Sequence, residues 1–315
     1  MLFETDFPEF TIRPMRPEEA HEVASLIFSS TNHWYESNGR GKIFSGKPED
    51  CSIFTQVYED LDPGCCFIAV SDSDQSILGS CFYHPRETHI SLGIMNTRPD
   101  TGRKGVAKAL LSEIVTEARF KRLPTRLVSS AFNLDSFSLY TRQGFAPYQF
   151  FQDMMVEVPY NGIATTAITG ISVRAGTPED AVRIDVLERS IWQTSRIKDW
   201  EYIAENHQRI WSLTVAENSG GKMMGALASI NHPGSELIGP GIAANEDVAK
   251  LMIQRELNQH RGSKAIVIIP SDKPTLVSSL YEMGARNCEL HVAQCLGDPP
   301  KINGVVMPTF LPETG

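Results

Sequence analysis

The chain has 315 residues, of which 41% are hydrophobic and 21% charged, a composition typical of a globular protein long enough for two domains. Its formal net charge of −9 argues against a nucleic acid partner, because an acidic surface repels phosphates. No apolar run approaches the roughly 20 residues that span a bilayer, and the first residues lack the basic and apolar parts of a signal peptide. We therefore expect a cytoplasmic protein with no membrane contact.

A short strand over residues 11–14 and a helix that starts at Pro17 are the first predicted elements. Glu18 and Glu19 would lie in the first turn of this helix, where the helix dipole favours acids.

The stretch 29–42 mixes aromatic, acidic and glycine residues and is a candidate surface for a small amine. Trp34 and Tyr35 could stack on such a ligand, and Glu36 could neutralise its ammonium group. The alternative is that aromatic residues at a helix end only pack.

A strand, a glycine loop and a helix are predicted between residues 92 and 114. The apolar run 92–95 suits the strand, and the helix shows a one-face repeat at Ala107, Leu110, Leu111 and Ile114. The first N–H groups of a helix have no intrahelical partner, and glycines let that backbone approach an anion closely. The loop between them, Gly102-Arg103-Lys104-Gly105, therefore predicts a phosphate site. A plain turn before a surface helix is the alternative.

A second segment strengthens this interpretation. After a strand at residues 126–130 come Asn133, then Leu139-Tyr140, then Gly144-Phe145. Together, the loop and this segment resemble the GNAT superfamily of acyltransferases. In that family an acetyl-CoA loop, Gln/Arg-x-x-Gly-x-Gly/Ala, opens a long helix, and a later helix reads Asn-x-x-Ala-x-x-Leu-Tyr-x-x-x-Gly-Phe. Gly102 stands where Gln or Arg is usual, and Ser136 replaces the small Ala.

The resemblance implies an α/β fold with a mixed sheet and acetyl-CoA as cosubstrate. It implies that the strand around Met95 holds the acetyl carbonyl and the pantetheine arm through backbone amides, and that Tyr140 protonates the departing thiolate. Asn133 could equally be a helix cap. The implied cofactor-binding residues are Met95, Thr97, Gly102, Arg103, Lys104, Gly105, Val106, Ala107, Asn133 and Ser136.

The general base is less clearly marked. His89 titrates in the appropriate range and precedes the apolar strand, with Glu87 as a weaker candidate, although a lone histidine is commonly structural. The resemblance also places the family's variable acceptor-binding loop at Trp34, Tyr35 and Glu36.

An internal repeat indicates a second copy of the fold. Residues 11–20 align with residues 172–181, and Ser138-Leu139-Tyr140 before Gly144 has a counterpart in Ser279-Leu280-Tyr281 before Gly284. The uncharged, turn-rich stretch 159–170 reads as a linker. We therefore predict two GNAT-like domains in tandem, residues 1–158 and 171–315. The apolar runs 66–70 and 265–269 suit their buried strands.

The second copy lacks the features of the phosphate loop. Its corresponding helix opens with Glu246 and Asp247, and carboxylates repel a pyrophosphate by about 1 kcal/mol each even in water. Gly239 and Gly241 in the preceding strand suit a turn or bulge. We expect a degenerate domain that does not bind CoA.

The six cysteines form no CxxC pair and no zinc spacing, so we expect reduced packing residues and no metal. The C-terminal Leu311-Pro-Glu-Thr-Gly315 is similar to a sortase signal without the segments that follow one.

The resemblance to the GNAT superfamily implies an N-acetyltransferase acting on a primary amine of a small molecule, with a second domain that shapes the acceptor cleft or a homodimer. The alternative is a non-catalytic acyl-CoA-binding or scaffolding module.

Overall fold

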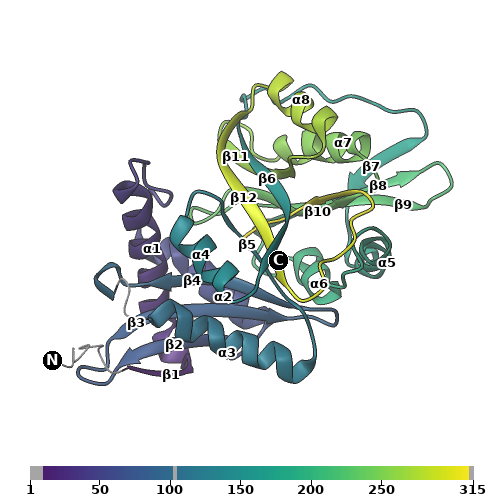
Figure 1. Ribbon diagram of the computed structural model, residues 1–315. Helices are drawn as coiled ribbons and strands as arrows, with labels where there is room; N and C mark the ends of the chain where they lie inside the picture. The colour runs from purple at the N-terminus through teal and green to yellow at the C-terminus, as the bar shows by residue number, and fades with distance from the viewer. Residues whose placement is uncertain (1–9, 102–104, 312–315) are drawn as a thin grey trace. The chain divides into compact units, whose positions relative to one another are not determined.

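The computed structural model describes residues 10–101 and 105–311, which form two compact units (Figure 1). The first unit comprises residues up to 85 together with 92–122, and the second comprises residues 86–91 and those from 123 onward.

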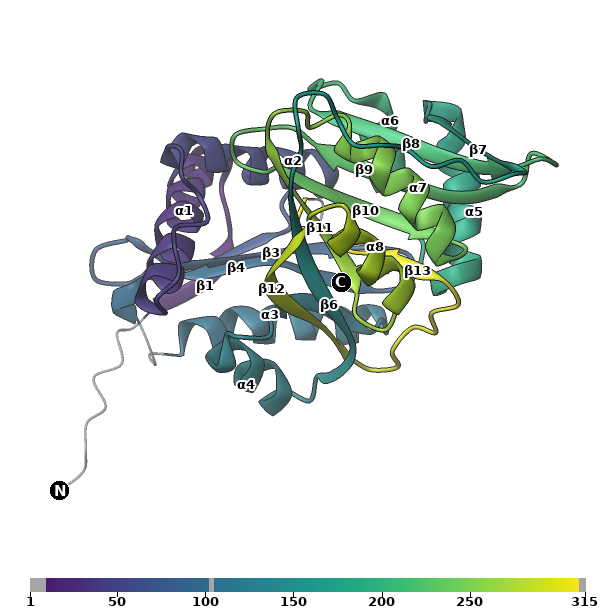
Figure 2. The ribbon, with the colours of Figure 1, turned by 90° about the horizontal axis from the view of Figure 1, so that it is seen from above.

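The first unit is a four-stranded sheet with helices on both faces. Its strands lie in the order β1-β2-β3-β4, and α1 and α3 cover opposite faces (Figure 2). Its elements are β1 (Phe10–Pro14), α1 (Ala20–Ser37), α2 (Ser52–Leu61), β2 (Cys66–Ser71), β3 (Ile77–Pro85), β4 (Ile90–Thr97), whose first two residues belong to the second unit, and α3 (Val106–Lys121).

The helix after the glycine loop forms as its periodicity predicts. Leu110, Leu111 and Ile114 of α3 are fully buried, while Ala107 is half-buried at the start of the same face. The apolar run 66–70 is confirmed as β2, which lies between β1 and β3.

The second unit is a larger mixed sheet. It consists of β5 (Thr125–Ser130), α4 (Leu134–Arg142), β6 (Ala146–Glu157), β7 (Ile171–Ala175), α5 (Ala181–Trp192), α6 (Ile197–Glu205), β8 (Trp211–Asn218), β9 (Met223–Ile230), β10 (Leu237–Ala243), α7 (Glu246–Leu257), β11 (Lys264–Pro270), α8 (Pro274–Glu282), β12 (Arg286–Leu296) and β13 (Val305–Met307). The helices α7 and α8 lie on one side of its strands and α5 and α6 on the other (Figure 1).

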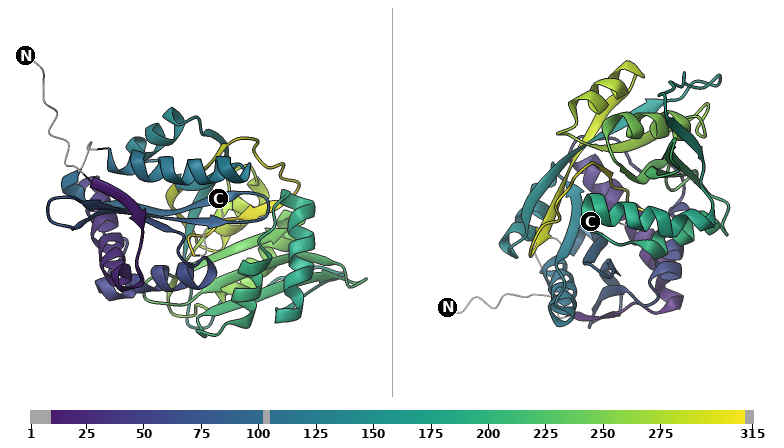
Figure 3. Two further views of the ribbon diagram at one scale, coloured as in Figure 1. Left: turned by 90° about the horizontal axis from the view of Figure 1, so that it is seen from below. Right: turned by 90° about the vertical axis from the view of Figure 1, so that its right-hand side faces the viewer.

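Strands distant in sequence alternate in the middle of this sheet. The order is β5-β12-β6-β11, so that β12 separates β5 from β6 and β6 in turn separates β12 from β11 (Figures 1 and 3). All three contacts are antiparallel, with His291 opposite Ser130 on one side and opposite Phe151 on the other. The sheet is therefore continuous from β5 to β11 only when both β6 and β12 are in place.

The two copies of the repeat open with the same local structure. A 3-10 turn, Pro17–Glu19 or Pro178–Asp180, precedes α1 or α5. The arginine of the preceding strand binds the last acid of each turn, at 2.6 Å for Arg13 and Glu19 and at 2.7 Å for Arg174 and Asp180. The two copies therefore begin with the same local structure, as the repeat predicts.

The segment 86–91 is fixed within the second unit by buried ion pairs. The guanidinium of Arg86 donates to both carboxylate oxygens of Asp199 in α6, at 2.9 and 2.5 Å. Neither side chain is more than 2% exposed, so removal of one partner would leave the other charge buried.

The predicted linker, residues 159–170, has no helix or strand. It is held against α7, because Ile163 N donates to Asn258 and Thr166 N to Gln254. The boundary between the compact units differs from the boundary that the repeat predicts, because residues 123–158 belong to the same unit as the C-terminal part. Domain limits at 158 and 171 stay a prediction from the repeat.

All six cysteines lie within the described residues and are reduced thiols, and four of them are buried as expected for packing residues. Cys288 is exposed, so the packing prediction is wrong for that residue, which lies at a register shift of β12. Across the described ranges, every helix is too short or too polar to cross a membrane.

Candidate functional site

The predicted phosphate loop ends at a helix whose first turn is suited to an anion. Gly105 precedes α3 with a φ of +83°, a left-handed conformation that favours glycine, and among the described residues no side chain caps the helix. The first turn of α3 contains no acid. Val106 is buried and Ala107 half-buried behind it. Gly102, Arg103 and Lys104 lie outside the described residues.

The turn that leads from β4 toward this loop is closely braced. Arg98 binds Asp100 at 2.6 Å, and the hydroxyl of buried Thr101 donates to the Arg98 carbonyl at 2.6 Å. A side chain at Gly79 would place its Cβ 2.8 Å from Val106 Cγ1, so this glycine allows β3 to approach the start of α3. The N-terminus of α3 is therefore fixed against the sheet.

The strand before the loop carries two of the predicted cofactor residues. Met95 and Thr97 of β4 are half-buried. Between them, the amide of Asn96 donates to the hydroxyls of Ser30 at 2.7 Å and Thr31 at 3.1 Å, which joins β4 to α1.

The helix α4 carries Asn133, Ser136 and Tyr140 in the second unit. Asn133 caps the helix, since its Oδ1 accepts from Ser136 N at 3.0 Å, which confirms the structural alternative considered for it. Tyr140 is buried and packs against Phe145 with ring centroids 6.0 Å apart. Its counterpart in the second copy, Tyr281, is 50% exposed.

The two predicted bases lie in the turn before β4. His89 is buried, and its Nδ1 lies 3.1 Å from the Thr88 hydroxyl. Glu87 is exposed and bound to Arg189 at 2.6 Å, and this guanidinium lowers the pKa of Glu87. A lower pKa makes the carboxylate a weaker base.

The predicted acceptor residues lie in a helix, not in a loop. Trp34, Tyr35 and Glu36 form the last turn of α1, which continues to Ser37. The rings of Trp34 and Tyr35 pack edge to face with their centroids 4.9 Å apart. The Glu36 carboxylate lies 3.8 Å from the Lys42 ammonium group. The loop expectation is wrong here because the helical run 20–37 has no Gly or Pro to end it.

A buried histidine and carboxylate in the first unit escaped the sequence analysis. His84 of β3 binds Asp62, which follows α2, at 2.7 Å, and the side chains are at most 2% exposed. The only sequence signal was Gly93 inside an otherwise apolar strand, since such a glycine often marks a close approach.

The second copy fills the corresponding helix terminus with its own side chains. Asn245 caps α7 through Val248 N at 3.0 Å, and the Glu246 carboxylate accepts from Leu276 N of α8 at 2.7 Å. Asn245 therefore satisfies one donor at the start of α7, and Glu246 and Asp247 place carboxylates in the first turn, where a phosphate would be repelled.

The strand β10 of the second copy has both edges occupied. β9 pairs with one edge, and β11 pairs with the other only at Leu237 and Ile238. A register shift between Ile238 and Gly241 confirms the predicted bulge. Beyond the bulge, the edge of β10 that faces β11 pairs with β13. The C-terminal segment therefore lies where β10 and β11 separate.

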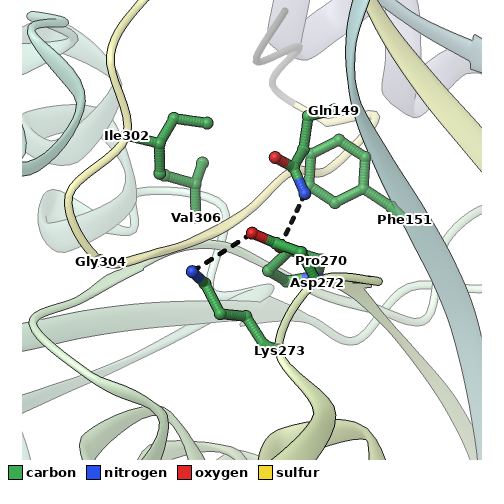
Figure 4. Close-up of a pocket in the computed structure, with 8 residues that line it drawn as sticks. All are labelled: Gln149, Phe151, Pro270, Asp272, Lys273, Ile302, Gly304 and Val306. Carbon is green, nitrogen blue, oxygen red and sulfur yellow. Dashed lines mark hydrogen bonds and ion pairs between the residues drawn. The ribbon is translucent and has the colours of Figure 1, made fainter.

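Only a small hollow is left at this place (Figure 4). Its empty space of about 160 Å³ includes volume open to solvent and leaves no room for a water molecule, so it is too small to be a small-molecule pocket. Asp272 accepts from Gln149 at 2.8 Å and lies 3.4 Å from the Lys273 ammonium group (Figure 4). The lining residues are Gln149, Phe151, Pro270, Asp272, Lys273, Ile302, Gly304 and Val306.

Gly304→Ala should lower the free energy of unfolding by about 1–3 kcal/mol, as expected for overpacking. The new Cβ would lie 2.5 Å from the Ala243 carbonyl oxygen and 2.9 Å from Ile191 Cγ2. Urea denaturation of the full chain measures the change. Gly220→Ala is the control, because its Cβ would meet only Asn218 Oδ1, at 3.4 Å. Equal stabilities for the two variants would mean that the segment before β13 is not held closely against β10.

Within the part of the chain that the structure describes, no cluster of three or more His, Cys, Asp or Glu side chains is arranged to hold a metal ion.

Residues 30–145 match the family model for the acetyltransferase (GNAT) family. This range contains the end of α1, together with β4, the glycine loop, α3 and Tyr140. No curated protein matches the sequence.

Solved structures of similar fold cover almost the whole chain. A candidate acetyltransferase from Pyrococcus horikoshii superimposes with a TM-score of 0.72 at 16% identity, over 97% of this chain and 95% of its own. A GCN5-related N-acetyltransferase from Sphaerobacter thermophilus gives 0.65 at 16% identity, over 93% and 97%. A tandem GNAT protein from the clavulanic acid biosynthesis pathway gives 0.60 at 12% identity, over 91% and 98%.

Proposed function

We propose that the chain, whose residues 30–145 match the model of the acetyltransferase (GNAT) family, is an acetyl-CoA-dependent N-acetyltransferase. The proposed acceptor is a primary amine of a small molecule, and the proposed acyl-CoA site belongs to the N-terminal copy alone. The second copy would shape the acceptor side or a homodimer.

The observation that carries the proposal is the contrast between the two helix termini. Gly105 starts α3 with no capping side chain and no acid, which leaves backbone N–H groups for a phosphate. In the second copy, Asn245 caps α7 through Val248 N, and Glu246 and Asp247 add two acids to the first turn. The separation of β10 and β11 is also filled by β13.

The residues around the glycine loop suit acyl-CoA. The amides at the start of α3, with Arg103 and Lys104, would hold the pyrophosphate. The backbone near Met95 and Thr97 would hold the pantetheine arm, with Ser136 of α4 and the Asn133 cap near the cofactor. The bound cosubstrate supplies an activated acyl thioester.

Tyr140 is the proposed acid. Its hydroxyl would give a proton to the thiolate as the C–S bond breaks, which lowers the energy of the leaving group. The buried ring and its packing on Phe145 would hold the hydroxyl in one orientation. From the sequence alone, His89 is a candidate base, with Glu87 as a weaker one.

The acceptor side is proposed to include the end of α1. Trp34 and Tyr35 would offer aromatic faces to a cationic amine. Glu36 would attract the ammonium group, in exchange for its 3.8 Å contact with Lys42.

Release of free CoA thiol from acetyl-CoA tests the function. The full chain is incubated with acetyl-CoA and a panel containing phenethylamine, spermidine, glucosamine and a dipeptide, and thiol is measured with a chromogenic disulfide. We expect amine-dependent thiol release together with an N-acetylated product by mass spectrometry. Acetyl-CoA binding without transfer to any amine would favour the scaffolding alternative. A lack of acetyl-CoA binding would overturn both.

A further inference from the structure

We propose that His84, oriented by Asp62, is the general base that deprotonates the attacking amine. The inference rests on the proposed acyl transfer and names a residue outside the motifs that suggested it.

The pair is built as an oriented imidazole. His84 Nδ1 lies 2.7 Å from Asp62 Oδ2, and the two side chains are 0% and 2% exposed. A carboxylate at Nδ1 fixes the proton on that nitrogen and leaves Nε2 as the basic atom. It also stabilises the positive charge that the ring acquires when it takes a proton.

The absence of a side chain at Gly93 of β4 leaves room for the His84 ring to approach this strand. A Cβ at Gly93 would lie 2.9 Å from His84 Nε2 and 2.9 Å from Phe82 Cβ, closer than real Cβ contacts. The backbone at Gly93 is not in the left-handed region, so its conformation does not require glycine. The close approach of His84 and of its strand neighbour Phe82 does. Nε2 therefore lies over the strand assigned to the acyl carbonyl and pantetheine arm.

Aromatic packing holds the ring in this place. Tyr58 of α2 lies 4.6 Å from the His84 ring and 4.9 Å from Phe82, between centroids. A ring fixed on three sides by Asp62, Tyr58 and Gly93 has one orientation, which a proton acceptor needs.

The other candidates lack this combination. Glu87 is engaged by Arg189, and the ring partner of His89 is the hydroxyl of the neighbouring Thr88. A second buried pair, His291 and Asp153 at 2.7 Å, has the same hydrogen bond but belongs to β12 and β6 of the other unit. It supplies a matched control.

The step balances without any further reactant. The amine nitrogen forms a bond to the acyl carbon and passes its proton to His84 Nε2. The C–S bond breaks, and the sulfur leaves with its electron pair and receives a proton from Tyr140. Products are the amide and free CoA thiol, after which His84 gives up its extra proton and Tyr140 regains one by exchange with solvent.

The test compares His84→Gln with His291→Gln in the full chain. We expect His84→Gln to lower kcat about 10²-fold, within the range for general base catalysis, with the acetyl-CoA Kd within twofold of wild type. His291→Gln should leave kcat within twofold. Asp62→Asn should lower kcat about tenfold, and ¹⁵N NMR of the unliganded protein should show that His84 no longer carries its proton on Nδ1. A merely structural pair would not link that tautomer change to kcat.

Several outcomes would overturn the assignment. Unchanged kcat in both His84→Gln and Asp62→Asn rejects it, and loss of kcat in His291→Gln alone gives the role to the other pair. If His84→Gln does not fold, Asp62→Asn decides, because it retains the ring. Failure of the wild-type protein to transfer acetyl groups would reject the proposed function itself, and an Nδ1-protonated His84 in that protein would still establish the oriented pair.

Discussion

Gly105→Glu is expected to abolish measurable acetyl-CoA binding by the intact chain. The new carboxylate would stand at the start of α3, where the pyrophosphate is proposed to meet the backbone N–H groups. Like charges about 4 Å apart cost roughly 1 to 4 kcal/mol depending on the local dielectric, and more than one phosphate would be affected. Isothermal titration calorimetry with acetyl-CoA should show the affinity falling by at least about 10²-fold.

Two variants separate charge from backbone strain in this experiment. Gly170→Glu introduces the same residue at a φ of +82°, against +83° at Gly105, and a Cβ at either position meets no atom within 4 Å. It should bind acetyl-CoA normally. Gly105→Ala carries the strain without the charge and should bind more tightly than Gly105→Glu. If Gly105→Glu binds like wild type, the phosphate loop has been misidentified.

Tyr140→Phe is expected to lower kcat by about 10² to 10⁴-fold while the acetyl-CoA Kd stays nearly constant. The change removes one hydroxyl and keeps the buried ring against Phe145, so packing should survive. A proton donor to the thiolate acts in the transition state and not in the ground state, which confines the effect to kcat. Initial rates at saturating acetyl-CoA measure it.

Tyr281→Phe is the matched control, because Tyr281 holds the corresponding place in the second copy. Its side chain is 50% exposed, and its hydroxyl lies 3.4 Å from Gln152 Oε1. We expect no change in rate. Equal losses at the two tyrosines would show that the chemistry was assigned to the wrong residue or the wrong copy.

Local signals predicted the elements that depend on neighbours in sequence. The buried positions of α3 follow the apolar period at Leu110, Leu111 and Ile114, and the cap at Asn133 follows from its side chain. The bulge in β10 follows from Gly239 and Gly241. Each of these features depends on only a few neighbouring residues, so the sequence alone can predict it.

Features that join distant residues could not be obtained this way. His84 and Asp62 are 22 residues apart, and nothing in either local sequence marks the partner. The position of β12 between β5 and β6 depends on long-range strand pairing, which a repeat in the sequence does not reveal. The same holds for β13, because a three-residue strand gives no periodicity to detect.

The alternation of β5, β12, β6 and β11 has a consequence for how the protein is made. β12 begins at Arg286, so during translation β5 and β6 are made well before their common neighbour. Until β12 is made, both strands present an unpaired backbone edge, which is prone to aggregate. A nascent chain that stops before residue 286 lacks this neighbour altogether, and we expect such truncated chains to aggregate more than chains that include β12.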